Sequence, residues 1–276
     1  MSPHKAQPIS INSLLISLWR NRQLCLQMTK RDVIGRYKGS VIGVLWSFLN
    51  PLFLLLVYSY VFSGIFKTRW WGAHTQGNSH YNVLLFIGMI IHSFFSETLS
   101  RAPSLILSNV SYVKKILFPL EILPVVAIGS ALFHAFVSMF VLIFSLLLMN
   151  GYLQWTALFV PLLILPLLIL TLGIAWGLAS LGVFLRDVSQ PISLIMTVFL
   201  FASPVFYPIS AVPESIRPWL MLNPLTFIIE QTRSVLIFGK IPDWIGLANY
   251  SLVSVVIGWI GYVWFQKTRK GFADVL

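Results

Sequence analysis

Charged residues are scarce in this sequence, and that scarcity excludes several classes of protein. Only 10% of the 276 residues are charged, whereas a soluble domain carries about 25%. Hydrophobic residues make up 57% of the chain, which also excludes a disordered protein. The single cysteine, Cys25, permits neither an internal disulfide nor a thiolate metal site, and we expect no bound metal. Most of the apolar side chains must therefore contact lipid.

Long apolar runs predict an all-α integral membrane protein. A helix that crosses a bilayer needs about 20 residues, and runs without alternation exclude a β-barrel. Asn150-Gly151 is a strong breaker pair and divides the longest run into two spans. We predict an N-terminal segment, 1–40, a six-span domain, 41–266, and a tail, 267–276. The predicted spans are 41–66, 81–99, 120–149, 157–185, 189–208 and 245–265.

The basic residues predict the orientation of these spans. The formal net charge is +11, and the bases lie at the edges of apolar runs rather than on a soluble module, so nucleic-acid binding is disfavoured. With six spans both termini lie on one side. That side holds fourteen Lys and Arg residues and the other side five, which places both termini in the cytoplasm.

The N-terminal segment contains two features besides its charge. Residues 9–28 predict an interfacial amphipathic helix, and the alternative is a flexible leader that only enforces orientation. The residues expected on its apolar face are Ile11, Leu14, Leu15, Leu18 and Trp19. Lys30, Arg31, Arg36 and Lys38 form a basic collar before the first span. This collar is either a stop-transfer anchor or a docking place for a phosphorylated lipid head group.

Aromatic residues recur along one face of the first span. Trp46, Phe53 and Tyr60 are seven residues apart, with Asn50 on the same stripe. Seven residues are close to two helical turns, so these side chains share a face. The stripe serves helix packing, or it forms an aromatic wall for sugar rings where that face lines a pore.

Two connecting segments are too long to be simple turns. The loop 99–119 carries apolar residues and predicts a short helix across the cytoplasmic face, either for a protein partner or for lipid. Prolines 191, 204 and 208 bracket and break the fifth span. The external stretch Leu225–Phe238 is too short to cross the membrane and predicts re-entrant helices, with Glu230 and Arg233 at ion-pair spacing.

The sequence lacks the motifs of several enzyme classes. G-x-x-x-x-G-K-[ST], H-E-x-x-H and G-x-S-x-G are all missing. His92 and His134 predict polar contacts between spans. Glu97 and Glu121 fall at span boundaries, so we expect no buried relay pair and no proton-coupled transport. The chain is predicted to be no enzyme and to depend on a separate source of energy.

Three tracts resemble the signature of one transporter family. They are residues 31–52 (RDVIGRYKGSVIGVLWSFLNPL), residues 118–124 (FPLEILP), and SPVFYP at 203–208 followed by LNPLT at 222–226. Their order and spacing are similar to the membrane subunits of ABC-2 type polysaccharide exporters. Among these, subunits of O-antigen exporters look nearest, and teichoic-acid and capsule exporters look like close relatives.

The resemblance implies partners and a substrate. Two copies would form a pore above two separate ATP-binding cassette subunits, which bind ATP and Mg, while this chain binds no cofactor. The cargo would be a polysaccharide on undecaprenyl diphosphate, moved across the bacterial inner membrane. The alternatives are an ABC-2 exporter of teichoic acid, capsule, or a small lipid or drug. A membrane-embedded transferase would need a carboxylate or histidine constellation near a membrane face.

The resemblance also implies roles for residues. The basic collar would contact the lipid diphosphate, and helices at about 210–240, including Glu230 and Arg233, would be re-entrant. The implied substrate path is Trp46, Asn50, Phe53, Tyr60, Phe206 and Tyr207. The helix that couples to the ATPase would include Arg101, Ser104, Leu105, Asn109, Tyr112 and Lys114.

Overall fold

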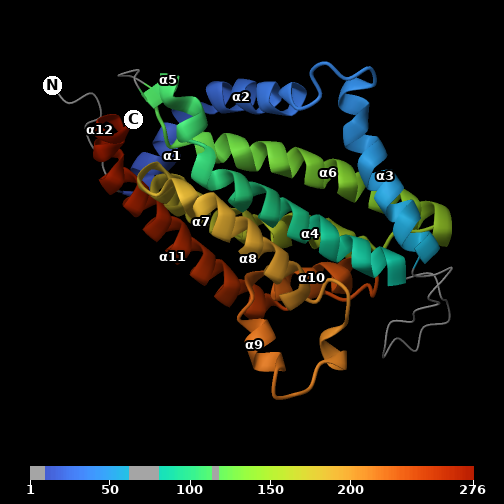
Figure 1. The fold of residues 1–276 in the computed structure, drawn as a ribbon. Coiled ribbons are helices and arrows are strands. Elements are labelled where there is room, and N and C mark those ends of the chain that lie inside the picture. Colours follow the sequence, from blue (N-terminus) through green and yellow to red (C-terminus); the bar gives the residue numbers. More distant parts are fainter. Residues whose placement is uncertain (1–9, 62–80, 114–117) are drawn as a thin grey trace.

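The protein is an all-helical bundle, as the sequence predicts. The computed structural model describes residues 10–61, 81–113 and 118–276, and every regular element within those ranges is a helix. Most of the long helices run side by side along one diagonal in Figure 1, whereas α3 crosses the side of the bundle. The terminal helices α1 and α12 lie at one end of this bundle, and α9 lies at the other.

The helices differ widely in length. The long ones are α1 (Ile11–Arg20), α2 (Arg22–Gly35), α3 (Trp46–Tyr58), α4 (Tyr81–Arg101), α6 (Ile122–Asn150), α7 (Val160–Phe184), α8 (Ser189–Ala202), α10 (Pro224–Leu236) and α11 (Trp244–Thr268). The short ones are α5 (Val110–Val113), α9 (Arg217–Met221) and α12 (Phe272–Val275).

Five helices within the described ranges are long and apolar enough to cross a membrane. They are Gly43–Val61, Tyr81–Ser104, Ile122–Asn150, Trp155–Phe184 and Trp244–Gly271. The predicted turn after the third span is confirmed, because α6 ends at Asn150 and Gly151 follows with φ 75°. This left-handed conformation suits glycine, which has no Cβ to clash.

The region of the predicted fifth span, 189–208, is only partly helical. α8 has 14 residues, which gives a length of about 21 Å against a hydrocarbon core of about 30 Å. It ends at Ala202 because Ser203 precedes Pro204 and takes an extended conformation. The six-span count therefore stays a prediction.

The N-terminal segment forms two helices rather than one. The predicted helix 9–28 is interrupted at Asn21, and α2 then continues to Gly35 through the first half of the basic collar. α2 lies along α6 (Figure 1). Gly129 allows this contact, since a Cβ there would lie 2.8 Å from the Thr29 hydroxyl oxygen.

The closest helix pair is α7 with α11, and glycines make it possible. A Cβ on Gly173 would lie 2.6 Å from the Cα of Gly258. A Cβ on Gly261 would lie 2.0 Å from the carbonyl oxygen of Gly173. Small residues at such contacts let two backbones approach inside a membrane, where van der Waals packing drives association.

A buried polar group joins the chain ends at the terminal end of the bundle. The Glu121 carboxylate accepts hydrogen bonds from the Ser17 hydroxyl at 2.9 Å and from Arg269 Nη1 at 2.8 Å. Trp176 Nε1 donates to the Glu121 carbonyl at 3.0 Å. α1, α7 and the segment after α11 are therefore held together around one residue, Glu121.

Candidate functional site

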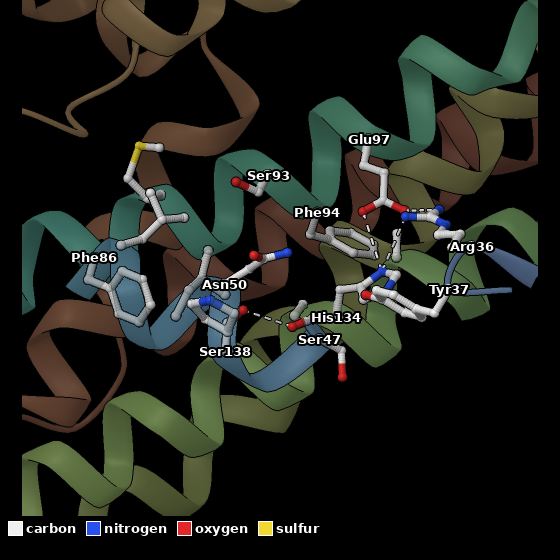
Figure 2. A pocket seen from close by; sticks show the side chains of 16 residues that line it. Arg36, Tyr37, Ser47, Asn50, Phe86, Ser93, Phe94, Glu97, His134 and Ser138 are labelled. Atoms are coloured by element: carbon white, nitrogen blue, oxygen red, sulfur yellow. Dashed lines mark hydrogen bonds and ion pairs between the residues drawn. The ribbon is translucent and has the colours of Figure 1, made fainter. Parts of the chain in front are cut away.

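A polar crevice opens between α3, α4 and α6, and Arg36 and Tyr37 close one end of it. Its volume is about 260 Å³. Figure 2 shows Arg36, Tyr37, Glu97 and His134 gathered at one end and Phe86 at the other. Asn50 of α3 and Ser93 of α4 line the stretch between these ends. Ionisable groups at membrane depth are costly, and they commonly mark a functional site.

The charged end of the crevice is built around Glu97. Arg36 forms an ion pair with the Glu97 carboxylate, and Arg36 Nη1 lies 3.4 Å from His134 Nδ1. His134 Nδ1 is 3.6 Å from the second carboxylate oxygen of Glu97. The Tyr37 hydroxyl lies 3.0 Å from His134 Nε2. Glu97 lies near the end of α4, at the span boundary where the sequence places it. Its contact with Arg36 was not expected, and it arises because α2 folds back along α6.

The His134 ring lies among three polar neighbours. Its Nδ1 faces both Arg36 and Glu97, and its Nε2 faces the Tyr37 hydroxyl. Burial raises the pKa of Tyr37, Arg36 opposes that shift and Glu97 adds to it, so Tyr37 stays a neutral hydroxyl.

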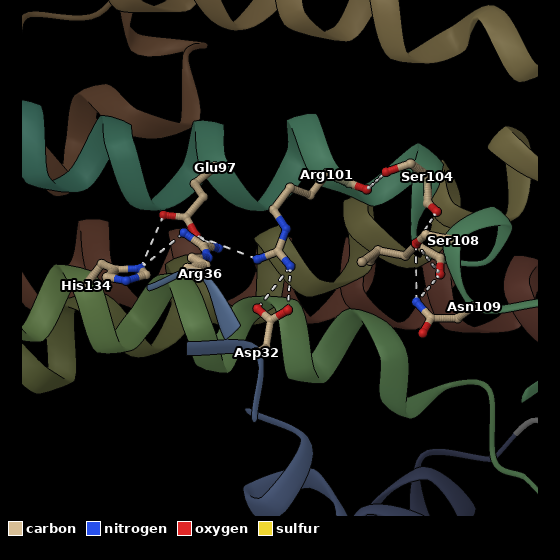
Figure 3. Close-up of polar contacts among 9 residues, drawn as sticks. Asp32, Arg36, Glu97, Arg101, Ser104, Ser108, Asn109 and His134 are labelled. Carbon is tan, nitrogen blue, oxygen red and sulfur yellow. Dashed lines mark hydrogen bonds and ion pairs between the residues drawn. The ribbon is translucent and has the colours of Figure 1, made fainter. Parts of the chain in front are cut away.

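A second ion pair continues the cluster toward the terminal end of the bundle. Arg101 Nη2 donates to both carboxylate oxygens of Asp32 at 2.9 Å, and Arg101 Nη1 lies 3.8 Å from Glu97 (Figure 3). The charges therefore alternate in the order Asp32, Arg101, Glu97, Arg36. This chain of charges connects α2 to the end of α4 and to the segment that follows it.

The four residues of the basic collar lie in different surroundings. Lys30 and Lys38 are exposed. Arg31 donates to the Tyr112 hydroxyl at 2.9 Å, and Arg36 contacts Glu97. Two of the four cations are thus engaged within the chain, and the contact with a lipid diphosphate stays a prediction.

The residues of the implied substrate path fall into three groups. Phe53 and Tyr60 expose 54% and 70% of their surface, so their rings make few contacts inside this chain. Trp46 donates to the Ser40 hydroxyl at 3.0 Å, and Asn50 lines the crevice. The third group is Phe206 and Tyr207, after α8. Phe206 stacks on a neighbouring ring of α8, and Tyr207 donates to a carbonyl of that helix at 2.9 Å.

The segment after α4 is not the continuous short helix that the sequence predicts. It consists of 3-10 turns at Ala102–Ser104 and Leu107–Asn109, followed by α5. Serine and asparagine side chains here donate to carbonyls three or four residues earlier in the chain. Among the implied coupling residues, Leu105 is buried, Ser104 is exposed, Asn109 donates to Leu105, Tyr112 stacks on Phe118, and Lys114 lies outside the described residues.

The predicted Glu230–Arg233 pair exists, with a distance of 2.9 Å. Sequence reasoning missed that Arg233 is 1% exposed and donates to the carbonyls of Leu84, Pro204 and Val205. Proline at 204 was the available signal, since it leaves carbonyls without helical partners. Burial lowers the pKa of Arg233 to about 10, with Glu230 opposing that shift, so the group stays charged at neutral pH.

The apolar helices and the charged crevice between them define a multi-pass membrane protein. Residues 23–237 match the model of the ABC-2 type transporter family, and the chain belongs to that family. It is 30% identical over 268 residues to an O-antigen export system permease protein RfbA of Myxococcus xanthus, covering 95% of this chain and 98% of that one. It is 24% identical to an RfbA of Klebsiella pneumoniae, covering 92% and 95%. It is also 24% identical to the polysialic acid transport protein KpsM of Escherichia coli, covering 83% and 88%.

Proposed function

We propose that this chain is the membrane-spanning permease subunit of an ATP-driven exporter that moves undecaprenyl-diphosphate-linked polysaccharide across the bacterial inner membrane. The observation that carries this proposal is its similarity over nearly the full length to permeases named for O-antigen export. The similarity to a polysialic acid transport protein supports a glycan as cargo rather than a drug. It also makes capsule export the second candidate function.

The proposed assembly contains two copies of this chain and two ATP-binding subunits. The charge bias places both termini in the cytoplasm, where residues 101–113 would meet the ATPase. Nucleotide binding would move this segment, and the spans would shift as rigid bodies. The Arg101–Asp32 ion pair supports this route, because it links the segment to α2.

Reconstitution with the cognate ATPase tests the proposed function. Lipid-linked glycan is expected to stimulate ATP hydrolysis by the complex and to cross into the vesicle lumen. A complex that hydrolyses ATP at one rate with and without the glycan would contradict the proposal. Transport by this chain without nucleotide or ATPase would contradict it as well.

Replacing Phe53 and Tyr60 together with alanine is expected to lower export by about tenfold, which corresponds to about 1.4 kcal/mol. Both rings are exposed, Phe53 on α3 and Tyr60 in the helical turn that follows it, so their loss would remove contacts to sugar without opening the core of the chain. The measurement is surface glycan alongside gel filtration of the purified complex. The matched control is Leu56→Ala on the same helix, which is also exposed. Unchanged surface glycan in the double variant would remove both residues from the path.

Gly182→Ala is expected to uncouple ATP hydrolysis from export. A Cβ at this position of α7 would lie 2.0 Å from the carbonyl oxygen of Pro103, so residues 102–104 must move away. We expect the ratio of glycan exported to ATP hydrolysed to fall by about tenfold. The control is Gly177→Ala on the same helix, where a Cβ meets nothing within 4 Å. Equal ratios for the two variants would show that this contact does not transmit motion.

A further inference from the structure

The Glu97 carboxylate is the anion that Arg36 binds at the charged end of the crevice. Its carboxylate lies against Arg36, and His134 and the Tyr37 hydroxyl complete that end (Figure 2). Arginine binds carboxylates and phosphates through the same planar set of donors. A phosphate anion is therefore chemically able to take over the contact that Glu97 makes.

Glu97 has two other polar groups within reach, the Arg101 guanidinium and the His134 ring, so losing Arg36 does not leave it unpaired. His134 Nδ1 lies 3.6 Å from the carboxylate and Arg101 Nη1 lies 3.8 Å from it. Arg101 Nη1 is buried without a hydrogen-bond partner, because Asp32 engages the other terminal nitrogen. Removing one partner of a desolvated pair is costly mainly because a bare charge remains. Here a small shift of Glu97 avoids that cost.

The crevice also changes character along its length. Beyond the charged end its lining includes the polar side chains of Asn50 and Ser93, and Phe86 lies at the far end (Figure 2). Leu54 and Met89 add apolar surface to the lining. A ligand that follows this gradient has an anionic head, polar groups beside it and an apolar portion. The crevice volume is about 260 Å³. Pockets for drug-sized ligands are larger, from about 300 Å³ upward. The crevice suits a head group rather than a polymer.

We propose that the crevice between α3, α4 and α6 is a phosphate-binding site in which the anionic head group of a membrane lipid displaces Glu97 from Arg36. Glu97 then contacts Arg101 and His134 instead, and Arg36 and Tyr37 donate to the phosphate. The inference deepens the proposed function and rests on it, because it gives one site to the phosphate of the lipid-linked cargo. When no lipid is bound, Glu97 pairs with Arg36, and an arriving phosphate must compete with it.

Two substitutions that are expected to change the lipid affinity in opposite directions test this exchange. The full chain is reconstituted with its ATPase in nanodiscs, and binding of undecaprenyl diphosphate is measured. Glu97→Gln removes the competitor and is expected to raise the affinity about tenfold, whereas Arg36→Gln is expected to lower it at least about tenfold. Arg20→Gln, which removes an exposed N-terminal cation, is the control and is expected to bind as the wild type does. Should Glu97→Gln fail to fold, Glu97→Asp withdraws the carboxylate from Arg36 and is expected to shift the affinity in the same direction.

Two further probes identify the source of the phosphate. Undecaprenol has the chain without phosphate and is expected to bind weakly, and inorganic pyrophosphate has the anion without the chain. Pyrophosphate binding as tight as that of the lipid would overturn the lipid assignment, and equal binding of undecaprenol would overturn the phosphate site. Lower affinity in both Glu97→Gln and Arg36→Gln would show a purely structural ion pair. Failure of the phosphate site alone would leave glycan-stimulated ATP hydrolysis intact in the wild-type complex. Failure of the proposed function would instead show as no stimulation by glycan in the wild-type complex.

Discussion

Gly261→Val is expected to destabilise the folded bundle severely. A Cβ at 261 would lie 2.0 Å from the carbonyl oxygen of Gly173, and both atoms belong to helix backbones. No side chain is available to move aside, so α7 and α11 must separate along their contact. Overpacking of a core costs about 1–3 kcal/mol where side chains adjust, and we expect at least the upper end here. A loss of that size is a large part of the about 5–15 kcal/mol that stabilises a typical protein.

The measurement for Gly261→Val is gel filtration and thermal unfolding of detergent-extracted protein. The expected result is aggregated protein, or an unfolding temperature lowered by about 10 °C. Gly177→Ala is the matched control, because this α7 glycine has open space around its Cα. A Gly261→Val variant as stable as that control would show that α7 and α11 do not pack in this way.

Arg233→Met is expected to be nearly as damaging, through lost polar contacts rather than through a clash. Arg233 is the buried donor for the carbonyls of Leu84, Pro204 and Val205. Methionine fills similar space but leaves those carbonyls and Glu230 without this partner. Leaving a buried acceptor without its partner costs about 1–3 kcal/mol for each group. The segment after α8 should detach from α4, and export should be lost with it.

Three variants separate this role from a general need for positive charge. Arg233→Lys keeps the charge but has fewer donors, so we expect an intermediate unfolding temperature. Lys240→Met removes an exposed cation close by in the sequence and is expected to change little. Glu230→Gln keeps the carbonyl contacts and tests the ion pair alone. Wild-type stability of Arg233→Met would show that the three carbonyls do not depend on this side chain.

Predictions from the sequence were most accurate where one local signal decides the structure. The all-helical class follows from apolar runs that lipid forces into helices, and the end of α6 at Asn150-Gly151 follows from the glycine. The Glu230–Arg233 pair follows from helical spacing. The segment after α4 was harder to predict. It was expected to be one short helix, and residues 101–113 instead form 3-10 turns, the first containing Pro103, followed by α5.

The crevice was hidden from sequence reasoning because its residues come from distant parts of the chain. Glu97 and Arg101 are four residues apart on one helix and predict a pair. Nothing local connects them with Arg36 or with His134, which lie far away in the sequence. Their meeting depends on the path of α2 along α6, which is set by helix packing.

The sequence by itself determined that this chain is a helical membrane protein, where most of its long helices lie, and to which transporter family it belongs. These properties depend on composition, periodicity and short motifs, which are local. Only the tertiary structure decided which charges are paired, that Arg233 is buried, and that Glu97 lies against Arg36. The physical reason is that burial and ion pairing depend on distances between helices, and backbone contacts such as Gly173–Gly261 set those distances.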